Sequence, residues 1–278
     1  MGFSAVQRIV GFLIAASSLM MLPPVLVSFW YDDGTAGVFA ACAGILLVTG
    51  LAIHYPVRHH RRDLRLRHGF LIVVCSWLAW VLVGALPFVL LTEPHLSYVD
   101  AVFESMSGLT TTGATIITDI DILPRAVLYY RQQLQWLGGM GIIVLAVAIL
   151  PILRVGGMQL YRAETPGPMK DAKLTPRITE TAKALWLIYF GITVTCVFAY
   201  WLAGMKLFDA VGHAFSTVAI GGFSTHDNSL AFWDNPTIEV VAIIFMAIAG
   251  VNFALHFSAW RRASAQPYFQ DPELKVYA

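Results

Sequence analysis

Apolar residues gather into long stretches that polar connections separate. The stretches cover residues 9–31, 36–55, 69–91, 127–152, 183–204 and 237–260. About 20 consecutive apolar residues are needed to cross a hydrocarbon core roughly 30 Å thick. The pattern therefore predicts an all-α integral membrane protein with six spans. The first stretch follows Arg8 but continues past Pro23-Pro24 without a small-residue cleavage site, so we interpret it as a retained helix rather than a secretory signal.

Two of the connections are themselves partly apolar. Each begins with a predicted half-helix, 98–109 in the first and 207–218 in the second, followed by Thr- or Gly-rich residues. Roughly a dozen residues are too few to cross a bilayer but suit a re-entrant segment. Irregular backbone at membrane depth survives only where it is buried in protein or lines a watery cavity, because lipid cannot satisfy its polar groups. The two connections therefore predict pore loops.

These pore loops belong to an internal repeat. An offset of 109 residues aligns Asp100 with Asp209, Ser107 with Ser216, Gly113 with Gly222, and Gly141 with Gly250. The predicted organisation is an N-terminal helical hairpin with a basic cytoplasmic loop (1–68), a first membrane helix, pore loop and membrane helix (69–153), a cytoplasmic linker (154–181), a second such repeat (182–262) and a polar tail (263–278).

Composition agrees with a location in lipid. The 278 residues are 58% hydrophobic and 13% charged, with a mean hydropathy of +0.69, whereas soluble domains are about 45–50% apolar and about 25% charged. Cys42, Cys75 and Cys196 lie in apolar stretches without CxxC spacing, so we expect free thiols. His59-His60, His226 and His256 lack metal-ligand spacing, and no transition-metal site is predicted. Motifs of enzymes are also lacking, and we expect no catalytic activity.

The net charge of +1 hides an asymmetry between connections. Basic residues crowd two of them: Arg58, Arg61, Arg62, Arg65 and Arg67, then Arg154, Arg162, Lys170, Lys173, Arg177 and Lys183. The alternate connections hold Asp32, Asp33, Glu93, Asp119, Asp121, Asp227 and Asp234. The positive-inside rule places the basic connections and both termini in the cytoplasm. Nucleic-acid binding is the alternative for the arginine cluster, but its place between two spans favours orientation.

The Thr- and Gly-rich segments have the chemistry of a cation filter. Backbone carbonyls can replace the hydration shell of a monovalent cation without the full charges that would trap it. Glycine reaches positive φ at little cost, so Gly113 and Gly222 would let successive carbonyls face one side. The predicted filter strands are residues 110–113 in the first connection, Thr110, Thr111, Thr112 and Gly113, and residues 219–222 in the second, Ala219, Ile220, Gly221 and Gly222. The alternative is that both segments are ordinary glycine turns, which their equivalent positions in a repeat disfavour.

Ionisable residues on the half-helices are further candidates. Asp100 and Asp209 lie near the N-termini of the half-helices, where the helix dipole is positive. The C-termini of the half-helices, where the dipole is negative, would face the loops. Glu104 and His213 occupy equivalent positions and predict either proton coupling or a hydrogen-bonding role that braces each loop.

Other polar and small residues have predicted packing roles. Arg131 is predicted to pair with Asp119 or Asp121. Gly138, Gly139 and Gly141 predict close helix packing. Asn252 and His256 are predicted to bridge helices from one helix face.

Several segments resemble the Trk/Ktr/HKT superfamily of potassium transporters, most closely its bacterial Trk-type members. They are SGLTTTGAT (107–115), LQWLGGMGIIVLAVAILP (134–151), GGMQLYRAETPGP (156–168) and FSTVAIGGFSTHD (215–227). The resemblance implies potassium uptake across the bacterial inner membrane through a filter with one strand from each of four repeats. It implies that the carbonyls of residues 110–113 and 219–222 are the K⁺ ligands of two of these strands. It further implies a homodimer in membrane lipid, on a cytosolic nucleotide-binding regulatory ring, with K⁺ as transported ion and no other cofactor.

The chain departs from this superfamily pattern because it holds only two of the four repeats. Three interpretations remain open: the sequence is a fragment, two copies surround one pore, or it is a non-conducting assembly or binding subunit. We favour a fragment, because in the superfamily more chain follows the second repeat. Gly113 favours the K⁺-selective kind within the superfamily.

Overall fold

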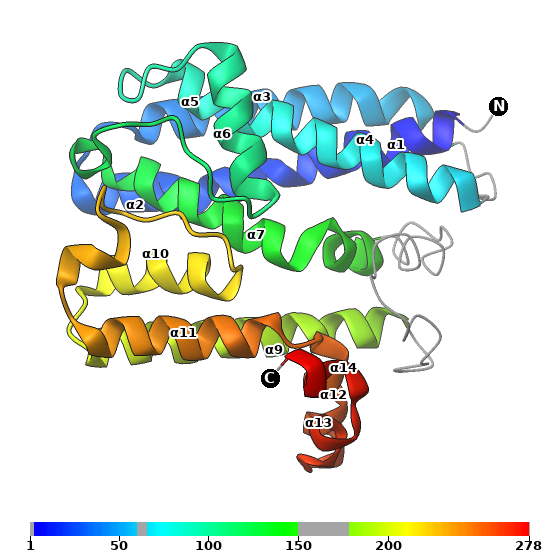
Figure 1. The fold of residues 1–278 in the computed structure, drawn as a ribbon. Helices are drawn as coiled ribbons and strands as arrows, with labels where there is room; N and C mark the ends of the chain where they lie inside the picture. Colours follow the sequence, from blue (N-terminus) through cyan, green and yellow to red (C-terminus); the bar gives the residue numbers. More distant parts are fainter. Residues whose placement is uncertain (1–2, 60–65, 150–177, 278) are drawn as a thin grey trace.

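Helices make up the regular structure of the protein (Figure 1). The computed structural model describes residues 3–59, 66–149 and 178–277. In chain order its helices are α1 (Phe3–Ser17), α2 (Leu22–Tyr31), α3 (Ala36–His54), α4 (Leu66–Gly84), α5 (Leu86–Leu90), α6 (Tyr98–Leu109), α7 (Arg125–Ile149), α9 (Ile178–Leu202), α10 (Leu207–Val218), α11 (Pro236–Gly250), α12 (Phe253–Arg262), α13 (Gln266–Gln270) and α14 (Pro272–Tyr277). Short 3-10 turns form η1 (Ser18–Met21), η2 (Tyr55–Val57), η3 (Ile120–Ile122) and η4 (Ser229–Trp233). The all-α prediction is confirmed.

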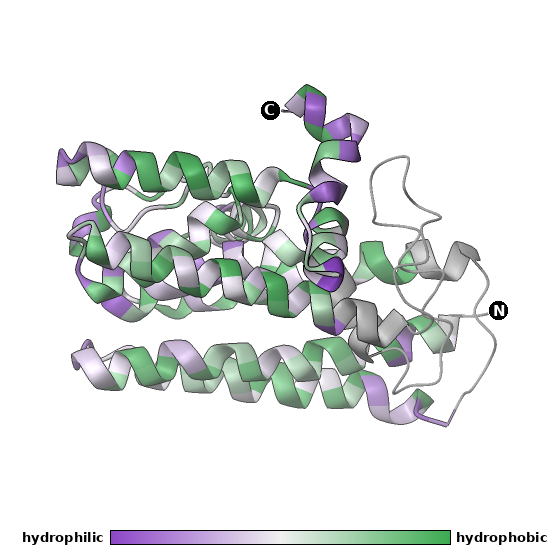
Figure 2. Cartoon of the chain, turned by 90° about the horizontal axis from the view of Figure 1, so that it is seen from below, coloured by the Kyte–Doolittle hydropathy of each residue, from purple (hydrophilic) through white to green (hydrophobic). Residues whose placement is uncertain are grey.

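The long helices have the length and surface of membrane spans. Within the described ranges, four are long and apolar enough to cross a bilayer: Ser4–Tyr31, Ala36–Val57, Leu71–Leu90 and Lys183–Leu202. Figure 2 shows hydrophobic residues along most of their length and hydrophilic ones gathered at the ends. Large apolar side chains such as Phe29, Trp30 and Val48 are exposed, as expected of a surface that faces lipid.

The prediction of one continuous helix for the sixth span is wrong. Instead of one helix over 237–260, α11 ends at Gly250 and α12 leaves it at 89°. Asn252 lies in the break rather than on a helix face, and its carbonyl accepts the amide of Leu255. His256 does bridge elements as predicted, since its ring bonds to the carbonyl of Ile248 and to the hydroxyl of Tyr268.

The second helix of the first repeat, α7, is also interrupted, at the position equivalent to Gly250. Gly141 has φ 68° and ψ 163° inside α7, and Gly141 is the residue that the 109-residue offset aligns with Gly250. A left-handed φ ends regular α-helix geometry and is cheap only for glycine. Gly141 therefore breaks a helix, which differs from its predicted packing role.

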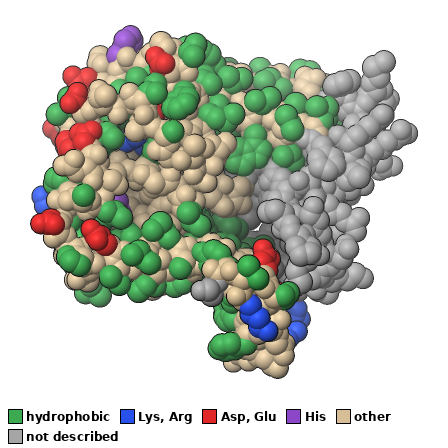
Figure 3. Space-filling view, viewed as in Figure 1, with side chains coloured by type: hydrophobic (Ala, Val, Ile, Leu, Met, Phe, Trp, Pro, Cys, Tyr) green, Lys and Arg blue, Asp and Glu red, His purple; other side chains and the backbone are tan. Residues whose placement is uncertain are grey.

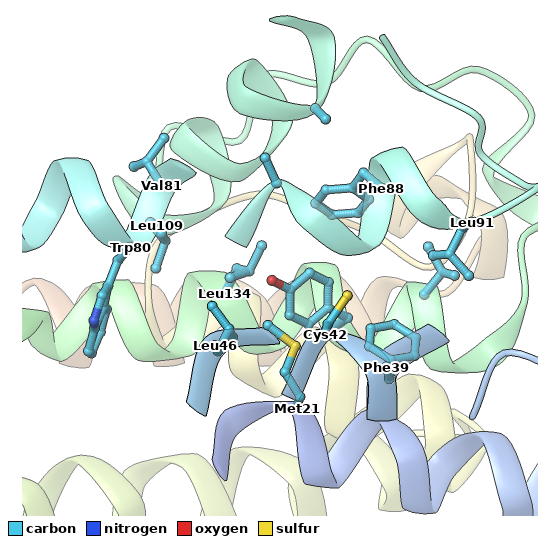
Figure 4. Packing of buried hydrophobic residues seen from close by; sticks show 14 of the residues in the cluster. Met21, Phe39, Cys42, Leu46, Trp80, Val81, Phe88, Leu91, Leu109 and Leu134 are labelled. Atoms are coloured by element: carbon cyan, nitrogen blue, oxygen red, sulfur yellow. The ribbon is translucent and has the colours of Figure 1, made fainter. Parts of the chain in front are cut away.

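The first apolar core lies where α1, α3 and α4 meet α6 and α7. Figure 4 shows Leu109 at the end of α6 and Leu134 of α7 in the same cluster as Trp80 and Leu46. A second cluster around Tyr189 and Tyr200 joins α9, α10 and α11. The two clusters hold the half-helices against the long helices and so fix where the pore loops lie.

Glycine allows the closest contact of the N-terminal helices. A Cβ on Gly50 of α3 would overlap the backbone of Ala15 in α1, with its Cα at 2.6 Å, whereas a Cβ on Gly44 would meet nothing within 4 Å. We expect Gly50→Ala to lower the midpoint of thermal unfolding in detergent, because overpacking costs about 1–3 kcal/mol. Gly44→Ala is the matched control and should leave the midpoint equal or higher, since alanine favours helix. An equal midpoint for both variants would contradict the contact.

Acidic side chains gather at one end of the face of the molecule that Figure 3 shows. Figure 3 shows Asp and Glu side chains gathered at the end of the molecule where α2 meets α3 and where η3 lies. Most of the residues in the two predicted basic connections, at 60–65 and 150–177, lie outside the described residues. The predicted orientation in the membrane therefore stays a prediction.

Candidate functional site: two repeated pore loops

The half-helices begin and end where the sequence predicts. α6 covers Tyr98–Leu109 and α10 covers Leu207–Val218. Ser97 caps α6: its hydroxyl accepts the amide of Asp100 at 3.3 Å and donates to the carboxylate of Asp100 at 2.8 Å. Such a cap satisfies a backbone donor that a helix start leaves open. Asp100 is thus an exposed capping residue of the first half-helix.

The segments after the half-helices, 110–113 and 219–222, are called here the first and second candidate filter segments. Their backbones follow the same pattern. Thr111 and Gly113 have φ of 54° and 76°, and the equivalent Ile220 and Gly222 have φ of 53° and 88°. Thr110 and Ala219 keep negative φ of −85° and −79°. Left-handed residues at alternate positions oppose the usual alternation of carbonyls along a strand, so the segments can present neighbouring carbonyls to one ion.

Backbone hydrogen bonds repeat in the same order. The amides of residues 110, 111 and 112 donate to the carbonyls of 106, 108 and 107, and the amides of 219, 220 and 221 donate to those of 215, 217 and 216. The six distances lie between 2.8 and 3.1 Å. Both non-glycine residues in left-handed conformation, Thr111 and Ile220, lie within this bonding pattern, which offsets the cost of about 1–3 kcal/mol for such a conformation.

The two segments meet through glycine. A Cβ on Gly113 would collide with the carbonyl oxygen of Gly221, whereas a Cβ on Gly222 would find nothing within 4 Å. Among the threonines, the Thr110 hydroxyl donates to the carbonyl of Met106 at 2.7 Å and bonds the hydroxyl of Thr112 at 2.8 Å. These hydroxyls therefore brace the first segment.

Helix α7 passes behind the start of both segments. A Cβ on Gly138 would collide with the carbonyl of Leu109, the residue before the first segment. A Cβ on Gly139 would come within 2.9 Å of Cα of Ala219, where the second segment begins. The predicted close packing at these two glycines is confirmed, and it places α7 between the two loops.

Glu104 braces the loop of its own repeat and pairs with a buried arginine. Its carboxylate accepts the hydroxyl of Thr115 at 3.0 Å and the amide of Ile116 at 3.3 Å. Arg131 donates from Nε to Glu104 Oε1 at 2.9 Å, and both side chains are fully buried. The predicted pairing of Arg131 with Asp119 or Asp121 is wrong, because α7 turns Arg131 inward to Glu104, whereas Asp119 and Asp121 are exposed in the connection before α7.

Arg131 also contacts the second loop. Its guanidinium donates to the carbonyl of Ser224 at 3.3 Å and to the hydroxyl of Thr115 at 3.0 Å, and lies 4.4 Å from the ring centre of Phe223. The planar guanidinium can hold several acceptors in fixed directions. One side chain of α7 therefore joins the segments that follow both candidate filter segments.

His213 has the role in the second repeat that Glu104 has in the first. Its Nε2 is hydrogen-bonded to Ser224 Oγ at 3.0 Å, and the 109-residue offset aligns Ser224 with Thr115. Asp209, at the start of α10, accepts the hydroxyl of Thr225 at 2.9 Å. Both half-helices thus use an ionisable side chain to hold the segment that follows, the bracing alternative of the sequence analysis.

Beyond the segments, the two loops form a clasp, defined here as Asp121, His226 and Asp227. Asp227 accepts the amides of Ile120 and Asp121 at 2.9 and 3.3 Å, and Asp121 in return accepts the amide of Asp227 at 3.2 Å. His226 Nδ1 is hydrogen-bonded to Asp121. The hydrogen bond from His226 is the main cause that lowers the pKa of Asp121 below its ordinary value.

The clasp should weaken in acid. A carboxyl whose pKa is lower in the folded than in the unfolded protein stabilises the fold above its unfolded pKa of about 3.9, and that contribution disappears as pH falls through the folded-state pKa. We expect Asp121→Asn to lower the thermal midpoint modestly at pH 7, because Asp121 is 45% exposed and such pairs are weak. At pH 3 the difference in thermal midpoint between the variant and wild type should be smaller. Asp119→Asn is the exposed control, and a constant difference at both pH values would contradict this role.

Comparison with known proteins decides the family. A family model described as "TrkH: Cation transport protein" matches residues 37–275. The chain belongs to the TrkH family. It is therefore a member of a family of membrane transport proteins, in agreement with its apolar helices.

Named members of the TrkH family match the whole chain. The "Trk system potassium uptake protein TrkH" of Halomonas elongata is 58% identical over 275 residues, and that of Escherichia coli K12 is 54% identical over 277. The alignments cover 99% and 100% of this chain and 57% of each relative. The crystal structure of the potassium transporter TrkH from Vibrio parahaemolyticus matches with a TM-score of 0.86 and 48% identity, over 100% of this chain and 56% of that one. The chain thus spans little more than half the length of these relatives.

Sequence reasoning missed two polar side chains of this TrkH family member that hold the loops. The sequence pattern pairs Arg131 with the wrong partner, and it does not single out Gln135, which accepts hydrogen bonds from Ser216 and from the Phe223 amide. A signal was present, since Arg131, Gln132, Gln133 and Gln135 place four polar residues within one turn and a half of a predicted membrane helix. Polar residues inside a membrane helix face protein or a watery cavity.

Proposed function

We propose that this chain provides two filter segments of a Trk-type potassium uptake system. The repeated left-handed backbone at Thr111 and Gly113 and at Ile220 and Gly222 carries the proposal. It is supported by relatives that are named as potassium uptake proteins. Carbonyl ligands suit K⁺ because they replace bound water without adding full negative charge.

The eight carbonyls of residues 110–113 and 219–222 are the proposed K⁺ ligands. Thr110, Thr112, Ile220 and Gly222 are exposed in this chain, whereas Ala219 and Gly221 are buried. Gly222 has no side chain, so its exposed surface is backbone, and irregular backbone at membrane depth needs further protein or a watery cavity beside it. The exposure therefore supports a pore completed by additional filter segments.

The completing segments are proposed to come from a longer chain of which this one is a part, because the matched region makes up only 57% of each TrkH relative. A second copy of this chain around the same pore is the alternative source. The proposed setting is the bacterial inner membrane with both termini cytoplasmic, as a homodimer on a cytosolic nucleotide-binding ring. The repeat boundaries 69–153 and 182–262 belong to the same proposal.

The decisive experiment is rubidium tracer uptake into proteoliposomes with two proteins. One is this chain alone, and the other is this chain joined to the part of the Halomonas elongata relative that lies outside the matched region. We expect the joined protein to take up rubidium in competition with K⁺ more than with Na⁺. Empty liposomes and the intact relative are the negative and positive controls.

The outcomes separate the alternatives. Uptake by the joined protein alone would support a fragment, and K⁺-blocked uptake by this chain alone would support two copies around one pore. A joined protein that inserts into the liposomes without uptake, while the intact relative is active, would overturn the proposal and favour a non-conducting assembly subunit.

A further inference from the structure

Gln135 of α7 is completely buried and reaches across the boundary between the repeats. Its Oε1 accepts two hydrogen bonds, from Ser216 Oγ at 2.6 Å and from the backbone amide of Phe223 at 3.0 Å. Ser216 is on half-helix α10 and Phe223 directly follows the second candidate filter segment. One carbonyl oxygen of the first repeat thus ties both ends of the second segment together.

The amide of Gln135 also lies flat against the segment itself. A Cβ on Gly221 would come within 2.5 Å of Gln135 Oε1 and 2.7 Å of Nε2, so the glutamine fills the space behind that glycine. Nε2 is buried and has no hydrogen-bond partner among the described residues. A buried donor without a partner costs free energy, so Nε2 does not hold the amide in place. The two hydrogen bonds to Oε1 and the packing against Gly221 do.

The bracing is not repeated in the second unit. The 109-residue offset aligns Gln135 with Ile244 and Arg131 with Val240. Ile244 and Val240 are 49% and 51% exposed on α11. The polar support is thus a property of α7, which is buried between two loops, and not a general feature of the repeat.

We propose that Gln135 is a positioning residue that sets the geometry of the second filter segment, and through it the preference for K⁺ over Na⁺. This inference rests on the proposed function. Gln135 acts from behind the segment and touches no ion: it holds the Phe223 amide and blocks rotation of the backbone at Gly221. Carbonyl placement decides which dehydrated cation is coordinated well, so loss of this support should relax discrimination.

The test compares three variants. Gln135→Leu keeps the size and removes the acceptor. Gln135→Glu keeps an acceptor for the same two donors and is the conservative rescue. Gln132→Leu is the matched control, because Gln132 lies on the same helix and is equally buried, but makes no hydrogen bond to the described residues.

Hydrogen exchange of this chain in detergent reports the positioning directly. We expect the Phe223 amide to exchange about fivefold faster in Gln135→Leu, the effect of losing one ordinary hydrogen bond. Exchange should be near wild type in Gln135→Glu and in Gln132→Leu. Wild-type exchange in Gln135→Leu would overturn the inference.

Competition between K⁺ and Na⁺ for rubidium uptake by the joined protein reports the consequence. Gln135→Leu should lose most of the K⁺ preference, Gln135→Glu should regain it, and Gln132→Leu should keep it. A preserved preference in Gln135→Leu, with its faster exchange, would overturn the effect on selectivity. An inactive wild-type joined protein would instead overturn the proposed function, and the exchange measurement would still decide whether Gln135 holds the segment.

Discussion

Replacing Gly113 with serine should abolish the preference for K⁺ over Na⁺ in rubidium uptake by the joined protein. Two costs coincide at this position. The φ of 76° is unfavourable for a residue with a side chain, by about 1–2 kcal/mol, and the new Cβ would collide with the carbonyl oxygen of Gly221. Because that carbonyl is a proposed K⁺ ligand, the collision displaces the second segment as well as the first.

Serine substitutions at two other glycines separate the cost of the backbone conformation from the cost of the Cβ collision. Gly222→Ser meets the same backbone strain at φ 88° in the equivalent segment, but its Cβ has open space. Gly34→Ser has φ 75° and open space in the turn before α3, away from both loops. We expect a graded loss of K⁺ preference that is largest for Gly113→Ser, smaller for Gly222→Ser and absent for Gly34→Ser. Equal K⁺ preference in Gly113→Ser and wild type would contradict the assignment of the segment.

Replacing Arg131 with methionine should be the most destabilising of the substitutions considered. The change leaves Glu104 as a buried carboxylate without its cation, and breaking a buried ion pair from one side costs about 3–5 kcal/mol. It also removes the bonds to Thr115 and to the Ser224 carbonyl. We expect a large fall in the thermal unfolding midpoint in detergent, together with loss of uptake by the joined protein.

A double-mutant cycle isolates the pair. Glu104→Gln combined with Arg131→Met removes both charges, so the double variant should be more stable than the sum of the single effects predicts. Arg125→Met is the matched control, because Arg125 begins the same helix but is placed over an aromatic ring instead of in a buried ion pair. Its guanidinium carbon lies 5.1 Å from the centre of the Phe208 ring. Such a contact contributes about 0.5–1 kcal/mol at exposed sites. Additive effects of Glu104→Gln and Arg131→Met would mean that the two charges do not depend on each other.

The half-helices could be predicted to the residue because their signals are local. Length limits, the flanking polar residues and the 109-residue repeat together define 98–109 and 207–218. The glycines at 113 and 222 were also predictable, since a repeated glycine in a membrane loop indicates a repeated φ requirement. Their left-handed conformations follow that expectation.

The supports behind the segments could not be predicted, because their partners are distant in sequence. Arg131 is 93 residues from Ser224, and Gln135 is 88 residues from Phe223. Apolar patterning specifies that a residue is in a membrane helix, but not which neighbouring helix its polar face meets. The break in the helix after Gly250 could not be predicted either, because the apolar stretch continues through it. The 89° bend between α11 and α12 leaves no mark in the apolar pattern.

The buried polar face of α7 has a consequence for how the chain enters the membrane. Gln135 is made more than 80 residues before Ser216 and Phe223, the partners that satisfy it, and Arg131 is made 93 residues before Ser224, its hydrogen-bond partner in the second loop. At about 5–20 residues per second, this interval is several seconds of synthesis. Lipid offers these groups no acceptors or donors. Glu104 and Thr115, by contrast, are only 11 residues apart and can meet at once. We therefore expect α7 to stay shielded at the insertion site until α9 and α10 have been made, so that the two repeats integrate as one unit rather than in succession.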